Sequence, residues 1–177
     1  SRIVKTDSQG RVWIGTRDGL SYYDEEKDQF KNFFYEKKGK RQQVNGIAEI
    51  SPEQLLISTQ EGLIMFDSKE SKFVEDAFST AMHKIIASAL YRHGDIIYIG
   101  TMEDGLYSYS VTQKNLEKVT PILDTKRIQA ILQQSPTRIW IATEGAGLLL
   151  LNPKTKELKT YLHSSSDPKS ISSNYIR

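Results

Sequence analysis

Four copies of one short pattern run through the chain, and this repetition constrains the fold more than any other feature of the sequence. The threonines that end the copies are 43, 42 and 42 residues apart. The four copies read Val12-Trp13-Ile14-Gly15-Thr16, Leu55-Leu56-Ile57-Ser58-Thr59, Ile97-Tyr98-Ile99-Gly100-Thr101 and Ile139-Trp140-Ile141-Ala142-Thr143. Gly-Leu follows each threonine, at Gly19-Leu20, Gly62-Leu63, Gly105-Leu106 and Gly147-Leu148. Such a period is typical of folds in which each copy forms one supersecondary unit.

Each copy contains short β-branched and aromatic runs separated by turn signals, which predicts strands and no helix. In the first copy we expect four strands, at 2–6, 12–16, 20–24 and 29–33. A repeat of about 40 to 45 residues with four antiparallel strands is typical of a β-propeller blade. The sequence therefore predicts an all-β fold, a single segment of a larger propeller. The expected blades are approximately 1–43, 44–84, 85–126 and 127–170, with 171–177 starting the next blade.

The residues around each threonine predict how blades pack. A small residue precedes each threonine, and a bulky residue lies two places earlier on the same strand face. We expect the bulky side chain to pack against the adjacent blade and the small position to admit that blade at close range. The threonine hydroxyl is expected to hydrogen-bond into the following turn. These are structural roles, and Trp13 and Trp140 would stabilise the fold strongly if fully buried.

Composition excludes several classes of protein. Lys+Arg 24 against Asp+Glu 22 gives a net charge of +2, too balanced for a protein that neutralises many phosphates. No apolar run approaches the ~20 residues that cross a bilayer, so any membrane anchor or signal peptide of a parent protein would lie outside this chain. The absence of cysteine excludes disulfides, thiolate metal sites and a cysteine nucleophile.

Catalytic and metal motifs are not found in the sequence. His83, His93 and His163 occur at unrelated repeat positions without metal-ligand spacing, and we interpret them as surface residues. An acidic residue recurs beside one turn in every copy, where a ring of carboxylates could bind a cation or sugar, but tight-turn geometry explains it better. These acidic residues are Asp18, Glu61, Asp104 and Glu144. We predict no cofactor, no metal and no enzymatic activity in this segment.

Basic residues indicate the face on which a ligand would bind, if this segment binds one. In a propeller, the connector that leaves the fourth strand shares a face with the turn between strands two and three. This geometry predicts one basic rim, although a run such as 37–41 is also typical of a solvated loop. The rim would contain Arg17, Lys37, Lys38, Lys40, Arg41, Lys84, Lys126 and Arg127.

The first copy, Gly10-Arg11-Val12-Trp13-Ile14-Gly15-Thr16-Arg17-Asp18-Gly19-Leu20-Ser21-Tyr22-Tyr23-Asp24, resembles the two-component regulator propeller repeat. The tail at 167–177, which reads DPKSISSNYIR, resembles the connector into the next blade of that family. The second and fourth copies depart from the pattern at Leu56, Ser58, Ala142 and Leu151. The family motif is structural and carries over no catalytic residue.

The resemblance implies the extracytoplasmic sensor region of a hybrid two-component histidine kinase of the Bacteroidetes kind. A periplasmic region of a parent anchored in the inner membrane would then bind an oligosaccharide derived from a polysaccharide, and a dimer would pass the signal to a kinase and its phosphorelay. A propeller scaffold for protein interaction and, less favoured, a glycan-active propeller enzyme remain alternatives. We also expect the isolated segment to self-associate, because open blade faces and strand edges favour association. No nucleic acid partner and no membrane insertion by this segment are expected.

Overall fold

A computed structural model describes residues 3–75, 82, 84–120 and 127–176 of the chain. The chain divides into two compact units, Ser1–Ala87 and Ser88–Arg177, and each is considered by itself. No helix in these described ranges is long and apolar enough to span a bilayer. The candidate sites below each lie within one unit.

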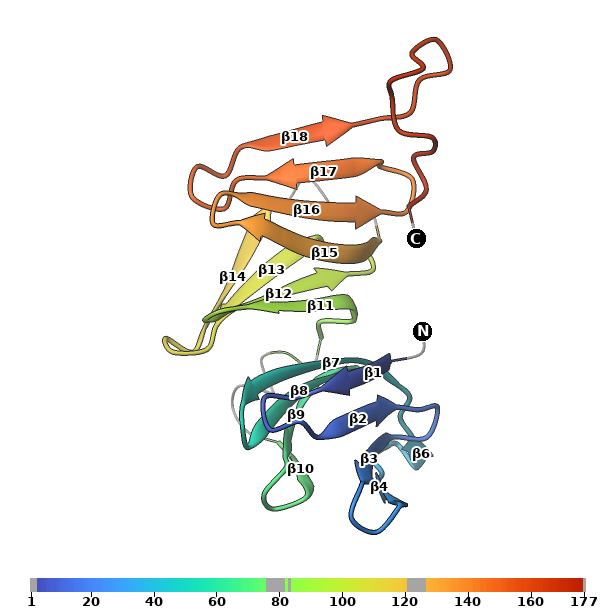
Figure 1. Cartoon of the computed structure of the whole chain (residues 1–177), viewed down its shortest axis with the longest axis vertical. Coiled ribbons are helices and arrows are strands. Elements are labelled where there is room, and N and C mark those ends of the chain that lie inside the picture. The colour runs from blue at the N-terminus through green and yellow to red at the C-terminus, as the bar shows by residue number, and fades with distance from the viewer. Residues whose placement is uncertain (1–2, 76–81, 83, 121–126, 177) are drawn as a thin grey trace. The chain divides into compact units, whose positions relative to one another are not determined.

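The first unit holds two four-stranded antiparallel sheets and one small hairpin (Figure 1). The first sheet is β1 (Ile3–Thr6), β2 (Val12–Gly15), β3 (Leu20–Asp24) and β4 (Gln29–Phe33). The second is β7 (Val44–Ser51), β8 (Gln54–Thr59), β9 (Gly62–Asp67) and β10 (Lys72–Val74). The hairpin between the sheets is β5 (Glu36–Lys37) and β6 (Lys40–Arg41).

The second unit follows the same plan, with two sheets whose strands pair in chain order. The first of them is β11 (Ala87–His93), β12 (Ile96–Thr101), β13 (Leu106–Ser110) and β14 (Asn115–Thr120). The other is β15 (Ile128–Ser135), β16 (Arg138–Thr143), β17 (Leu148–Leu151) and β18 (Leu158–Tyr161). The predicted four-stranded antiparallel repeat is therefore confirmed. In the first copy the strand bounds agree within one residue, and Arg2 lies outside the described residues.

The repeated threonines end the second strand of each sheet, or in β2 follow its last residue, and close the turn that comes next. In all four turns the threonine hydroxyl donates to the carbonyl oxygen of the repeated glycine, as the sequence predicts. The Oγ1 to O distances are 3.0 Å for Thr16 and Gly19, 2.8 Å for Thr59 and Gly62, 2.8 Å for Thr101 and Gly105, and 2.7 Å for Thr143 and Gly147. The same hydroxyls accept backbone N–H groups, so each turn is fixed in one geometry.

The small residue before the threonine lies where two sheets of one unit meet. A Cβ atom on Gly15 would be 2.8 Å from Cγ1 of Val44, the first residue of β7. A Cβ atom on Gly100 would be 2.5 Å from Cγ2 of Ile128, the first residue of β15. Distances this short allow no side chain, because the neighbouring strand occupies the space. The predicted close approach of adjacent sheets is confirmed at both positions.

The two tryptophans of the repeat differ in their surroundings. Trp13 is only 2% exposed, and its ring meets Phe66 of β9 edge-on at a centroid distance of 5.6 Å. The predicted packing against the adjacent sheet is thus confirmed for Trp13. Trp140 is half-buried, and its ring centroid lies 5.5 Å from that of Tyr161 in its own sheet, so the condition of full burial is met by Trp13 and not by Trp140. The Trp140 ring therefore retains more contact with solvent than the Trp13 ring.

A buried carboxylate holds the Trp13 ring in place. Oδ2 of Asp7 accepts the indole N–H of Trp13 at 2.8 Å and Nε–H of Arg11 at 2.6 Å. Its Oδ1 accepts the backbone N–H groups of Gln9 and Arg11. Burial raises the pKa of Asp7, but these hydrogen bonds and the Arg11 charge outweigh it and lower the pKa below 3.8. In the fourth sheet the uncharged Gln134 corresponds to Asp7. Its Oε1 accepts hydrogen bonds from Arg138 Nε and Trp140 Nε1, each at 3.0 Å.

Asp7→Asn is expected to destabilise the first unit by about 2 kcal/mol at pH 7, because it weakens charge-assisted hydrogen bonds to Arg11 and Trp13. The Asp7 pKa is lowered in the folded state, so its contribution is complete above the unfolded pKa and disappears as the pH falls from about 5 through the folded value. Urea unfolding at pH 7 and pH 3 should therefore show the native and variant stabilities converging in acid. The exposed Asp18→Asn serves as control, and a pH-independent gap for Asp7→Asn would contradict the prediction.

Candidate functional site

The two-stranded hairpin between the sheets of the first unit carries half of the predicted basic rim. β5 and β6 pair Glu36 with Arg41 and Lys37 with Lys40. The tip residues Lys38 and Gly39 have φ angles of 54° and 71°, the left-handed conformation that two-residue hairpin turns require. Lysine is uncommon in this conformation, and the following glycine adopts it freely. The local sequence thus forms a tight hairpin that presents Lys37, Lys38, Lys40 and Arg41, here called the basic hairpin.

Two buried polar residues anchor the basic hairpin to the core. Tyr35 and Gln42 flank it and are 7% and 6% exposed. The backbone N–H of Gln42 donates to the Tyr35 carbonyl at 2.8 Å, and its side-chain Nε2 donates to the Lys40 carbonyl at 3.0 Å. The Tyr35 hydroxyl donates to Glu75 Oε1 at 3.1 Å, and burial together with this carboxylate raises the Tyr35 pKa to about 12. The basic side chains therefore project from a hairpin whose backbone is held in place by Tyr35 and Gln42.

The charges of the basic hairpin are only partly neutralised. Arg41 Nε lies 3.6 Å from Glu36 Oε1, and the Arg41 guanidinium lies 3.9 Å from the centroid of the exposed Phe34 ring. Lys38 Nζ is 3.9 Å from Glu61 Oε2, and its side chain is 81% exposed. Exposed ion pairs of this kind contribute about 0–1 kcal/mol and exchange partners easily. The hairpin can therefore bind an anion, with an aromatic ring beside its cations.

The β2–β3 turn lies against Phe34, in the connector that leads into the basic hairpin. A Cβ atom on Gly19 would be 3.3 Å from Cα of Phe34, so this turn, which carries the exposed Arg17, contacts the connector.

A row of amides that the sequence analysis missed lies close in the chain to the rim. Gln60 Nε2 donates to Gln43 Oε1 at 3.3 Å, and Gln43 Nε2 donates to Asn45 Oδ1 at 3.0 Å. Amides next to cations are suited to sugar hydroxyls and acidic groups.

The remaining predicted rim residues are not joined to the basic hairpin by any described contact. Lys84 is exposed and belongs to the first unit, whereas Lys126 lies outside the described residues. Arg127 is exposed in the second unit, where its carbonyl accepts the backbone N–H of Glu144 at 2.9 Å. The structure thus brings Lys37, Lys38, Lys40 and Arg41 together on one hairpin and places the turn of Arg17 against Phe34, which precedes it in the chain.

The acidic turn residues have local partners. Lys118 Nζ lies 2.7 Å from Asp104 Oδ1, and this contact, with a hydrogen bond from Tyr107, lowers the Asp104 pKa. Glu144 Oε2 accepts from Gln129 Nε2 at 2.9 Å. Among the described residues, no group of three or more His, Asp or Glu side chains is placed to hold a metal ion. His93 and His163 are exposed, and His83 lies outside the described residues.

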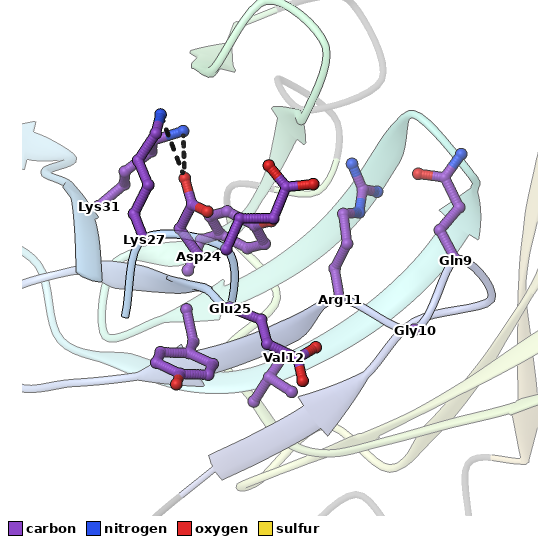
Figure 2. A pocket seen from close by; sticks show the side chains of 11 residues that line it. Gln9, Gly10, Arg11, Val12, Asp24, Glu25, Lys27 and Lys31 are labelled. Carbon is purple, nitrogen blue, oxygen red and sulfur yellow. Dashed lines mark ion pairs between the residues drawn. The ribbon is translucent and has the colours of Figure 1, made fainter. Parts of the chain in front are cut away.

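A second candidate is an open groove of about 480 Å³ in the first unit (Figure 2). The β1–β2 turn, β3 and the β3–β4 turn contribute to its lining, and Lys27 and Lys31 lie side by side with both ammonium groups directed to Asp24. The Asp24 Oδ2 atom is 3.1 Å from Lys31 Nζ and 3.7 Å from Lys27 Nζ, and the Lys31 contact lowers the Asp24 pKa. The lining carries three basic side chains, of Arg11, Lys27 and Lys31, and three acidic ones, of Asp24, Glu25 and Glu26, so this groove is less suited to an anionic ligand than the basic hairpin.

Comparisons with known proteins relate the chain to bacterial sensors through structure alone. No family model matches the chain, and no curated protein matches it. The extracellular domain of the putative hybrid two-component system BT4673 from B. thetaiotaomicron is similar, with TM-score 0.75, 18% identity and coverage of 93% of this chain and 22% of that one. The corresponding domain of BT3049 has TM-score 0.65, 23% identity and coverage of 91% and 24%.

A third similar structure is PorZ, a surface component of the type-IX secretion system of Porphyromonas gingivalis, with TM-score 0.66, 16% identity and coverage of 97% and 28%. The chain spans about a quarter of the length of these relatives. Identities this low show a common fold and no more. The chain therefore has the repeated four-stranded architecture found in the extracellular domains of hybrid two-component sensors.

Proposed function

We propose that the chain is an extracytoplasmic ligand-sensing segment of a two-component sensor histidine kinase, and that it responds to oligosaccharides derived from polysaccharides. The main support for this proposal is that more than nine-tenths of the chain is structurally similar to the extracellular domains of two such systems. The four in-register copies and the connector at 167–177 support the same proposal. In this role the segment binds and transmits, and a separate kinase performs the chemistry.

The basic hairpin and the turn of Arg17 are the proposed ligand surface. Their cations favour an oligosaccharide that carries carboxylate or sulfate groups, because long-range attraction concentrates anions at such a surface. The exposed Phe34 ring offers a flat apolar contact, and the neighbouring amides can hydrogen-bond hydroxyls. The proposed blade boundaries given above place this surface at the junction of the first two blades.

The link to a kinase is tested by sequencing the coding DNA on both sides of this segment. We expect further in-register copies, then an apolar span of ~20 residues and a histidine-kinase core. A reading frame that leads instead into a glycan-active domain would favour the enzyme alternative. A frame that encodes only more repeats, without membrane span or kinase, would favour the interaction scaffold.

The ligand surface is tested by titrating the chain with hexagalacturonate and, separately, with neutral cellohexaose by calorimetry. We expect salt-dependent binding of the acidic hexasaccharide. The triple variant Lys37→Gln/Lys38→Gln/Lys40→Gln should weaken it at least tenfold, because three cations of the basic hairpin are lost and no buried residue is changed.

The matched control is Lys5→Gln/Lys69→Gln/Lys169→Gln, which removes the same charge from exposed positions elsewhere. The two variants should unfold at the same urea concentration as the native chain. Equal affinities of the two triple variants would show that net charge, and not the basic hairpin, attracts the acidic glycan.

A further inference from the structure

A pocket of about 240 Å³ lies in the second unit between the sheet β11–β14 and the β17–β18 turn. Ile96 and Tyr98 of β12, Ser108 of β13 and Val119 of β14 form its inner wall, and Pro153 of the turn faces them. Glu117, Lys154 and Lys156 complete its lining. The pocket is distinct from the basic hairpin and from the groove of Figure 2, and it goes beyond the function proposed above.

Comparison of the repeated sheets explains why the pocket exists. Strand pairing places one residue from each of three neighbouring strands side by side across a sheet. In the first sheet these are Trp13, Tyr22 and Lys31, whereas in β12–β14 they are Tyr98, Ser108 and Glu117. The corresponding middle residue is Met65 in the second sheet and Leu150 in the fourth. Of these four middle residues only Ser108 is small, so its side chain occupies the least space on its face of the sheet.

A buried tyrosine lines this space. Tyr98 is 4% exposed, and its hydroxyl has no hydrogen bond to any part of the chain that the structure describes. Burial alone raises the Tyr98 pKa, with no hydrogen-bonding group acting on it. An unpaired buried hydroxyl costs about 1–3 kcal/mol, so a ligand atom that hydrogen-bonds Tyr98 would recover part of that free energy.

The chemistry of the walls defines the ligand. Ile96, Val119, Pro153 and the Tyr98 ring favour a compact apolar body, and the hydroxyls of Tyr98 and Ser108 can bond one or two polar atoms of it. A whole sugar ring would bury more hydroxyl groups than these two partners satisfy. Lys154 and Lys156 are exposed and make no ion pair with any described residue, so they are available to a carboxylate.

We propose that this pocket binds a compact organic acid, one with an aromatic or similarly apolar body, a hydroxyl that hydrogen-bonds Tyr98, and a carboxylate directed to Lys154 and Lys156. The hydroxyl of such a ligand satisfies the buried phenol, and the two lysines hold the charged end near solvent. Binding therefore fills the space that Ser108 leaves beside Tyr98.

The experiment is a titration of the whole chain with 4-hydroxybenzoate, benzoate and 4-hydroxybenzamide, followed by nuclear magnetic resonance of the backbone amides. We expect 4-hydroxybenzoate to bind most tightly, with shifts centred on Ile96, Val119 and Lys154. Benzoate lacks the hydroxyl and 4-hydroxybenzamide lacks the charge, and each should bind about tenfold more weakly. Absence of saturable binding by all three compounds up to ~10 mM would overturn the proposal.

Three variants separate binding from folding. Tyr98→Phe should weaken 4-hydroxybenzoate about tenfold while leaving the unfolding midpoint unchanged or raised, because it removes an unpaired buried hydroxyl. Ser108→Leu, which copies Leu150 of the fourth sheet, should abolish binding by filling the pocket. Lys154→Gln/Lys156→Gln should weaken the acid and not the amide, with the exposed Lys169→Gln as control.

A lowered unfolding midpoint in Tyr98→Phe, or undiminished binding to Ser108→Leu, would overturn the proposal. The basic hairpin experiment uses other residues and another class of probe. Failure of either proposal therefore leaves the result of the other intact.

Discussion

Trp13→Ala is expected to destabilise the first unit by about 3–5 kcal/mol, a large part of the stability of a typical domain. The ring is 2% exposed and packs against Phe66 at 5.6 Å, Tyr22 at 5.3 Å and Phe33 at 6.2 Å. Its removal leaves a cavity where two sheets meet, and it deprives the Asp7 carboxylate of the indole N–H that donates to it. Urea unfolding by circular dichroism and hydrogen exchange of the β2 and β3 amides measure the loss.

Trp140→Ala is the matched control, because Trp140 occupies the same repeat position and is half-buried. It should cost only about 1 kcal/mol, since less apolar surface returns to water and Gln134 carries no charge. Hydrogen exchange should show the Trp13 effect in the first unit. Equal losses for the two alanine variants would mean that the contact with Phe66 contributes little.

Gly147→Ala is expected to destabilise the second unit by about 2–4 kcal/mol, for two reasons that act together. Gly147 has a φ of 76°, which alanine adopts only with strain. A Cβ atom there would also lie 2.3 Å from the Tyr161 carbonyl oxygen and 2.9 Å from Cδ2 of Leu162. Relief requires β18 to move away from β17, which should appear as faster hydrogen exchange in both strands.

Gly94→Ala separates the two causes, because Gly94 has a similar φ of 58° and no atom within 4 Å of the position of a Cβ. The strain alone should cost about 1 kcal/mol there. If Gly147→Ala proves no more harmful than Gly94→Ala, the crowding against Tyr161 is absorbed by small backbone shifts.

Spacing predicted the fold well because the same interactions recur in each copy. The threonine hydroxyl, the following glycine and the small residue before the threonine each serve one local purpose, and a period of 42 or 43 residues makes that purpose visible. The strands of the first copy follow directly from it. The basic hairpin was found as a charged run, but its strands and its anchors, Tyr35 and Gln42, depend on burial that no local pattern encodes.

Features that distinguish one copy from another were harder to predict. The sequence does contain a pattern that could have predicted the Asp7 hydrogen bonds. Asp7 precedes Trp13 by six residues, and Gln134 precedes Trp140 by the same number. An arginine lies between the two residues in both copies. The sequence pattern that could have predicted the pocket beside Tyr98 is weaker. Ser108 is unremarkable in its own strand, and only the pairing of β12, β13 and β14 shows that it replaces a large side chain. Differences between aligned copies therefore locate sites better than the shared pattern does.

Pairing of strands in strict chain order has a consequence for the growing polypeptide. Every four-stranded sheet is built from neighbours in sequence, so its contact order is low and it can form while the ribosome is still adding later residues. The first sheet is nevertheless incomplete until β7 and β9 emerge, when the Val44 N–H reaches the Thr16 carbonyl and Phe66 covers Trp13. Translation that stalls between β4 and β9 would leave that indole in water, on a nascent chain ready to aggregate.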